Sequence, residues 1–233
     1  MHFDGLRKTV NKGLIVCVAA LGTVAWDLPQ RSSGADASAK VLYLTFDDGP
    51  SMRYTPQILD ILKREHVQAT FFVVGYRCNQ LPHIIKRIHL EGHEIGNHGY
   101  SHVYWSEVAQ ESEKREHLIR DILETDRAIE HTAGIRVEYY RPPGGLVDKG
   151  ETEIVHKLGH RLVLWSVDSL DWNATDAKSI IQNVEQRAGP GSIVLFHDGV
   201  SSSRYTVLAL PELIKYYRHL GYRFEALPPH RGQ

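Results

Sequence analysis

Short runs of apolar and β-branched residues alternate along the chain with longer amphipathic stretches. Runs of this kind are typical of buried strands, and they read KVLYLTF (40–46), ATFFVVG (69–75), HEIGNH (93–98), VEYYRPP (137–143), RLVLWSVD (161–168), SIVLFHD (192–198) and YRFEAL (222–227). The amphipathic stretches predict helices over 56–65, 82–90, 106–130, 151–158, 176–186 and 207–220. Three glycines, Gly92, Gly159 and Gly221, follow such stretches where a helix C-terminal cap is expected.

Strands that alternate with helices predict an α/β fold with a parallel sheet. Seven predicted strands suit a closed or distorted barrel as well as a doubly wound open sheet, and periodicity does not separate these two architectures. The first predicted helix follows DDGPSM, which is neither a G-x-G-x-x-G fingerprint nor a P-loop. Nucleotide-binding open sheets are therefore less favoured.

The N-terminal segment differs from the rest of the chain. Basic residues at 7, 8 and 12 precede the apolar run 14–26, and a polar segment of small residues follows it. This order is typical of an export signal, because a run of 13 residues is shorter than the roughly 20 that cross a bilayer. We expect an export signal or membrane anchor with a linker over 1–39 and one globular domain over 40–233. The protein is then secreted or attached to the cell envelope through 14–26.

Composition narrows the class of partner. The chain has 233 residues, of which 42% are hydrophobic and 24% charged, as expected of a domain with a sizeable core. Its formal net charge of -1 disfavours nucleic acid or any other partner bound by bulk electrostatics. Only Cys17 and Cys78 are present, so we expect no disulfide within the globular domain. A neutral or small partner is favoured.

Ionisable side chains gather where the predicted strands end. In parallel α/β folds the chemistry lies at the carboxyl ends of the strands. Five of these ends carry only Asp, His and Arg, namely Asp47 with Asp48, His98 with His102, Arg141, Asp168 with Asp171, and His197 with Asp198. The pattern predicts one active rim.

His98 and His102 have the spacing of two ligands to one metal ion if the segment turns helically. Two further pairs, His89/His93 and His156/His160, straddle helix-ending glycines and are expected at the opposite rim. Two histidines and one carboxylate leave coordination positions open, as in a catalytic site. Either Asp47 or Asp48 can supply the carboxylate, and the other is then free to act as a base.

The segments TFDDGP, NHGYSH, RPPGG, DSLDW and LFH follow one another in this order. This set resembles the five motifs of the polysaccharide deacetylases, carbohydrate esterase family four, over residues 40–228. The resemblance implies a distorted (β/α) barrel. It also implies metal-dependent removal of acetyl groups from a polymer that contains N-acetylglucosamine, such as peptidoglycan or chitin-like oligomers.

By this resemblance, Asp48, His98 and His102 would bind one divalent metal, usually Zn²⁺, with Co²⁺ and Ni²⁺ as alternatives. Asp47 would be the general base, and Arg141 would hold its carboxylate. The two adjacent aspartates would then have different functions.

The remaining roles implied by the resemblance concern the leaving group and the acetyl pocket. His197 would be the general acid, oriented by Asp171, with Asp168 as the weaker candidate. Leu195 and Trp172 would line the pocket for the acetyl methyl group. These assignments complete a hydrolytic site, since an amide needs a proton for its departing nitrogen.

Gly144 departs from the family pattern. It would supply a backbone N–H to the developing oxyanion, but the family often has a larger residue after RPP, so one wall of the sugar groove loses a side chain.

Three other functions stay open. They are O-deacetylation of acetylated xylan, non-catalytic binding of an envelope polysaccharide, and an iron(II) oxygenase built on the two-His-one-carboxylate set.

Overall fold

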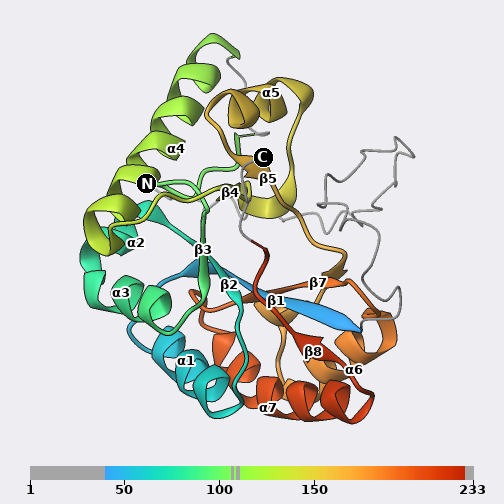
Figure 1. Ribbon diagram of the computed structural model, residues 1–233. Helices are drawn as coiled ribbons and strands as arrows, with labels where there is room; N and C mark the ends of the chain where they lie inside the picture. The colour runs from blue at the N-terminus through green and yellow to red at the C-terminus, as the bar shows by residue number, and fades with distance from the viewer. Residues whose placement is uncertain (1–39, 106–107, 109–110, 229–233) are drawn as a thin grey trace, which may run out of the picture. The chain divides into compact units, whose positions relative to one another are not determined.

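A parallel sheet of eight strands forms the centre of the fold (Figure 1). The computed structural model describes residues 40–105, 108 and 111–228, so the predicted export segment lies outside the described residues. Seven strands lie in the order β5-β4-β3-β2-β1-β7-β6, and β8 pairs with the beginning of β1. The bounds are β1 Val41–Gly49, β2 Thr70–Val73, β3 Glu94–Asn97, β4 Tyr139–Tyr140, β5 Arg161–Leu162, β6 Val167–Asp168, β7 Ile193–His197 and β8 Arg223–Phe224.

The central strand β1 is apolar along most of its length because both of its faces are covered. On the face toward the helices, Phe46 stacks on Phe71 of β2 and Phe196 of β7, with ring centroids 5.0 and 5.7 Å apart. The next residue of β2, Phe72, belongs to a separate buried cluster with Tyr139 on the inner face. Successive strand residues thus fill two cores, as the two-residue period requires.

Helices connect the strands and cover the outer face of the sheet (Figure 1). Gly92, Gly159 and Gly221 have φ of 82°, 86° and 81° and lie two residues after the ends of α3, α5 and α7, so their predicted capping positions are confirmed. The described helices are α1 Tyr54–Arg64, α2 Gly75–Gln80, α3 Pro82–Leu90, α4 Glu111–Ala133, α5 Lys149–Lys157, α6 Ala177–Arg187 and α7 Ser203–His219, with 3-10 turns η2 Pro143–Gly145 and η3 Asp171–Asn173. The helix α2 was not predicted.

The prediction that RLVLWSVD (161–168) forms one strand is wrong. The run forms β5, which pairs with β4, and β6, which pairs with β7 at the other end of the sheet. Between them, the backbone oxygens of Val163 and Leu164 accept hydrogen bonds from Nε and Nη2 of Arg141, at 3.1 and 3.0 Å. A side chain therefore takes the place of strand pairing where the barrel is incomplete, and the fold is the predicted distorted (β/α) barrel.

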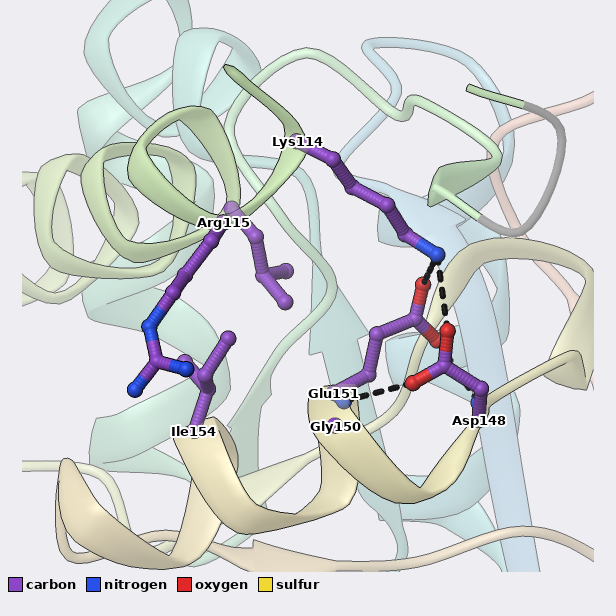
Figure 2. A pocket seen from close by; sticks show the side chains of 7 residues that line it. Lys114, Arg115, Asp148, Gly150, Glu151 and Ile154 are labelled. Atoms are coloured by element: carbon purple, nitrogen blue, oxygen red, sulfur yellow. Dashed lines mark hydrogen bonds and ion pairs between the residues drawn. The ribbon is translucent and has the colours of Figure 1, made fainter. Parts of the chain in front are cut away.

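The segment after β4 is fastened to α4 by a group of charged side chains (Figure 2). Lys114 Nζ lies 2.8 Å from Asp148 Oδ2 and 2.9 Å from Glu151 Oε1. Asp148 and Glu151 also form a capping box that begins α5. Since η2 directly precedes this segment, the ion group anchors one side of the active rim to α4.

We expect Lys114→Met to destabilise the fold by about 2 kcal/mol, because Glu151 stays buried without its cation. Asp148 is half exposed, which lowers the cost below that of a fully buried pair. Chemical denaturation measures the free energy of unfolding. The matched control is Arg115→Met, which removes the neighbouring exposed cation and should change that energy by less than about 0.5 kcal/mol. Equal stability of the two variants would contradict the anchoring role.

Among the residues that the structure describes, no helix combines the length and apolar character needed to span a bilayer.

Candidate metal centre and active site

Near its carboxyl end, the strand β1 carries two adjacent aspartates whose backbones differ. Asp47 keeps the sheet register, opposite Phe72 of β2 and His197 of β7. The register shifts between Asp47 and Gly49, and Asp48 has a φ of 71°. This left-handed conformation is uncommon for a residue with a side chain. The irregularity lets both carboxylates reach the rim, whereas neighbours in a regular strand point to opposite faces.

Arg77 of α2 holds the backbone of this turn. Its Nη1 donates to the carbonyl oxygen of Asp48 at 2.7 Å and to that of Gly199 at 3.0 Å. Its Nε donates to the hydroxyl of Tyr76 at 2.9 Å, which fixes the guanidinium. The turn after β1 and the turn after β7 are therefore tied together through one side chain.

We expect Arg77→Met to weaken Zn²⁺ binding by about 10- to 100-fold, because Asp48 loses the hydrogen bond that stabilises its backbone. Zinc titration against a competing chelator measures the affinity, and thermal unfolding shows that the fold persists. Arg64→Met is the matched control, since this exposed arginine ends α1. Unchanged zinc affinity in Arg77→Met would show that the turn needs no such support.

Asp48, His98 and His102 form a group whose ligand atoms all lie within 4.8 Å of one another. Asp48 Oδ1 is 3.3 Å from His98 Nε2 and 2.7 Å from His102 Nε2. It is buried, and no described residue gives it a hydrogen bond of good geometry. His98 Nδ1 donates to the carbonyl oxygen of Arg141 at 2.7 Å, which leaves Nε2 as a free ligand atom. These residues fit a metal ion with open coordination positions.

The local charge also favours a cation at this point. Burial opposes ionisation of Asp48, but the close imidazoles of His102 and His98 outweigh it and hold the pKa of this carboxyl well below its ordinary value. Burial likewise disfavours a charged His98, yet Asp47 and Asp48 raise its pKa above the ordinary value. Two carboxylates thus stabilise positive charge between them, which is the requirement for binding a dication.

Arg141 fixes one oxygen of Asp47 and leaves the other free. The guanidinium is completely buried and stacks on Phe72, with 4.0 Å from Cζ to the ring centroid. Its Nη1 donates to Asp47 Oδ1 and to Thr45 Oγ1, both at 2.8 Å. Asp47 Oδ2 lies 3.7 Å from His98 Nε2 and so faces the metal-binding group. This oxygen is placed to accept a proton beside a bound metal.

His197 at the end of β7 is held by a buried carboxylate. Its Nδ1 lies 2.7 Å from Asp171 Oδ1, and its backbone N–H donates to Asp171 Oδ2 at 2.8 Å. Thr206 Oγ1 donates to the same Oδ2 at 2.6 Å. Burial opposes a charged imidazole, but the hydrogen bond and charge of Asp171, with Asp47 and Asp48, raise the pKa of His197 to about 9. The imidazolium can therefore donate a proton from Nε2 at neutral pH.

Comparison with known proteins agrees with this geometry. Residues 34–163, more than half of the chain, match the family model described as polysaccharide deacetylase. The chain belongs to the polysaccharide deacetylase family. A peptidoglycan-N-acetylglucosamine deacetylase of Bacillus cereus is 37% identical over 205 residues, which cover 87% of this chain and 90% of the relative.

Two further members of the family are similar over most of their length. A chitooligosaccharide deacetylase of Sinorhizobium fredii is 34% identical over 212 residues, which cover 86% of this chain and 94% of the relative. A crystal structure of a peptidoglycan N-acetylglucosamine deacetylase, in complex with 4-naphthalen-1-yl-N-oxidanyl-benzamide, gives a TM-score of 0.77 at 36% identity and covers 82% of this chain and 87% of that one. These matches confirm the predicted family and fold.

Other positions named by the deacetylase motifs lie at the same rim. Of the two candidate aspartates in DSLDW, Asp171 contacts His197, whereas Asp168 Oδ1 accepts from the N–H of Leu170 at 2.8 Å. Trp172 in η3 is 54% exposed, and Leu195 in β7 is 3% exposed. Their roles at an acetyl pocket stay predictions, as do the catalytic and ligand roles of the other motif residues.

Gly144 presents a free backbone donor. No described residue accepts a hydrogen bond from its N–H, although the neighbouring Gly145 N–H donates to Pro142 O at 3.0 Å. Gly144 has a φ of 71° within η2, a conformation that glycine adopts without strain. The donor that the resemblance assigns to an oxyanion is therefore unpaired within the described part of the chain.

The sequence analysis placed Asp198 at the active rim but gave it no role, and it did not include two other supporting residues. Asp198 is fully buried and accepts a hydrogen bond of 2.5 Å from Thr55 Oγ1. Burial raises its pKa to about 7, and a side chain at Gly49 would overlap its carboxylate. The two residues that were missed are Arg77 and Thr206, since neither lies in a motif. The available signal in the sequence was that Asp198 directly follows His197 at the end of β7, but this position alone indicates no function for it.

Proposed function

We propose that this chain is a metal-dependent hydrolase that removes N-acetyl groups from polysaccharide containing N-acetylglucosamine, either peptidoglycan or chitin-like oligomers. One observation carries the proposal. A proton acceptor, Asp47 Oδ2, and a proton donor, His197, both adjoin the group formed by Asp48, His98 and His102. The named activities of the Bacillus cereus and Sinorhizobium fredii relatives support the substrate class.

Zinc is the proposed metal, since two imidazoles and one carboxylate suit Zn²⁺ and leave room for water and substrate. When bound by Asp48, His98 and His102, it would polarise the acetyl carbonyl and lower the pKa of water at the site. Co²⁺ and Ni²⁺ remain alternatives that accept the same donor set.

The residues of the chain account for the proton transfers. Asp47 Oδ2 takes a proton from the attacking water, while Arg141 holds the other carboxylate oxygen. The N–H of Gly144 donates to the oxyanion that forms from the carbonyl oxygen. His197 Nε2 then gives its proton to the amide nitrogen as the C–N bond breaks, and Asp171 stabilises the imidazolium before transfer. The products are acetate and a free amine on the sugar.

The test is the release of acetate and free amine from peptidoglycan, N-acetylglucosamine oligomers and acetylated xylan, measured in parallel. We expect amine from the first two, loss of nearly all of the rate after chelation, and recovery when Zn²⁺ is added back. Acetate without amine, from xylan alone, would show O-deacetylation instead. No release from any polymer by zinc-loaded protein would overturn the proposed function.

We also propose that the protein acts outside the membrane. The basic residues and the apolar run 14–26 support export, and peptidoglycan lies in that compartment. Fractionation of cells that produce the full chain tests this, with deletion of residues 1–39 as the control. Recovery of the full chain from the cytosol would contradict export.

A further inference from the structure

A side chain at position 144 would overlap the ring of Tyr104. A Cβ atom built on Gly144 would lie 2.5 Å from Cε1 and 2.7 Å from Cδ1 of the Tyr104 ring. Carbon atoms at van der Waals contact are 3.5–4.0 Å apart, so a side chain at 144 would have to displace the ring. The space that a larger residue after RPP would occupy is thus filled by an aromatic ring from the segment after β3.

Tyr104 stands beside the metal-binding group and faces solvent. Its ring meets His102 edge-on, with centroids 5.5 Å apart and planes at 90°. Its exposure is 43%, whereas the adjacent Trp105 is 8% exposed and packs in a core cluster with Leu118 and Ile122. Trp105 therefore contributes to folding, and Tyr104 presents an aromatic surface at the rim.

A second exposed aromatic residue lies on the other side of the centre. Tyr104 follows β3, and Trp172, which is 54% exposed, follows β6. In the sheet order, β3 lies two strands from β1 on one side, and β6 lies two strands from β1 on the other. Because β1 carries Asp47 and Asp48, the two aromatic side chains flank the catalytic group. Aromatic surfaces on both sides suit a ligand with apolar ring faces.

We propose that Tyr104 is a substrate-binding residue that supplies the aromatic wall of the polysaccharide groove on the β3 side of the metal centre. It contacts the apolar face of a pyranose ring of the substrate, and Gly144 leaves room for its ring. This inference rests on the proposed deacetylase function and names a sugar-binding residue for it.

Kinetics on the N-acetylglucosamine pentamer tests the inference with zinc-loaded full-length protein. We expect Tyr104→Ala to raise KM about 10-fold with kcat changed less than about 3-fold, since a ring contact in the ground state persists in the transition state. Tyr104→Phe keeps the ring and should match the wild type within about 2-fold. Tyr216→Ala removes an exposed tyrosine of α7 and is the matched control. Zinc content should be equal in all variants.

A double-mutant cycle tests the shared space. Gly144→Ala strains the backbone at a φ of 71° and so should lower kcat with or without Tyr104, but it should raise KM only where the Tyr104 ring is present to be displaced. The KM of Gly144→Ala with Tyr104→Ala should therefore equal that of Tyr104→Ala alone. Additive increases in KM would show that the two positions act independently and would overturn the pairing. Loss of zinc in Tyr104→Ala would show that the ring only positions His102, which also overturns the proposal.

Calorimetry separates this inference from the proposed function. The pentamer is titrated into zinc-loaded Asp47→Asn protein, in which cleavage is slowed about 10²- to 10⁴-fold, with and without Tyr104→Ala. A Kd about 10-fold weaker without the ring supports the inference even if the wild type releases no acetate. Equal Kd and equal KM with and without Tyr104 would refute it while leaving deacetylation intact.

Discussion

Asp47→Asn should lower the rate of acetate release by about 10²- to 10⁴-fold while the protein keeps its zinc. An amide cannot take a proton from water, but it has the shape of the carboxylate and can still accept the hydrogen bond that Arg141 gives to Oδ1. The three proposed ligands are untouched. Initial rates of amine release, with elemental analysis of zinc after dialysis, measure both quantities.

Asp48→Asn is the matched change, because it alters the adjacent carboxylate in the same way. Here we expect zinc affinity to fall by at least about 100-fold, since the amide offers a weaker, neutral ligand in a group that also contains His98 and His102. Activity should return in part when zinc is raised. Loss of zinc in Asp47→Asn, or full activity in this variant, would contradict the proposal that Asp47 is the base and Asp48 the metal ligand.

Much of the site could be predicted because it depends on local sequence. The strand β1 had to carry Asp47 and Asp48 close to its end, since an apolar run there meets two charges and a Gly-Pro pair. Parallel strands bring their carboxyl ends to one rim, so His98 and His197 had to approach β1. Motif identity then separated the proposed ligand Asp48 from the proposed base Asp47, which periodicity alone could not do.

The parts that escaped prediction depend on contacts between distant segments. The short helix α2 has no strong amphipathic pattern. The role of its Arg77 depends on hydrogen bonds to two carbonyl oxygens in other turns, those of Asp48 and Gly199. The run 161–168 is apolar at 162–165 and 167 and contains no glycine or proline, so nothing in it signals a break. Its division into β5 and β6 reflects the incomplete barrel and Arg141. Tyr104 and Gly144 are 40 positions apart in the chain, and their shared space is visible only in the fold.

The charge of Asp171 should determine where activity is lost at high pH. His197 must be protonated to act as the acid, and its raised pKa of about 9 keeps it so through neutral pH. Activity is present below this pKa and is lost as the pH rises through it. Zinc, once bound, opposes the contributions of Asp47 and Asp48, so the alkaline limb of the loaded enzyme should fall between the ordinary 6.5 and about 9.

Asp171→Asn should move this limb to lower pH and reduce kcat at pH 8 by about 10²- to 10³-fold. The amide keeps the size of the side chain but removes its charge, so burial, which lowers the pKa of His197, is opposed only by the more distant charges of Asp47 and Asp48. The pH profile of kcat/KM measures the shift, because a merely structural defect would lower the rate equally at every pH. Asp168→Asn is the control in the same motif, since that carboxylate binds the Leu170 N–H instead of the imidazole. An alkaline limb at the same pH in Asp171→Asn and wild type would mean that His197 does not supply the proton, and the acid would then have to be sought among the other groups at the rim.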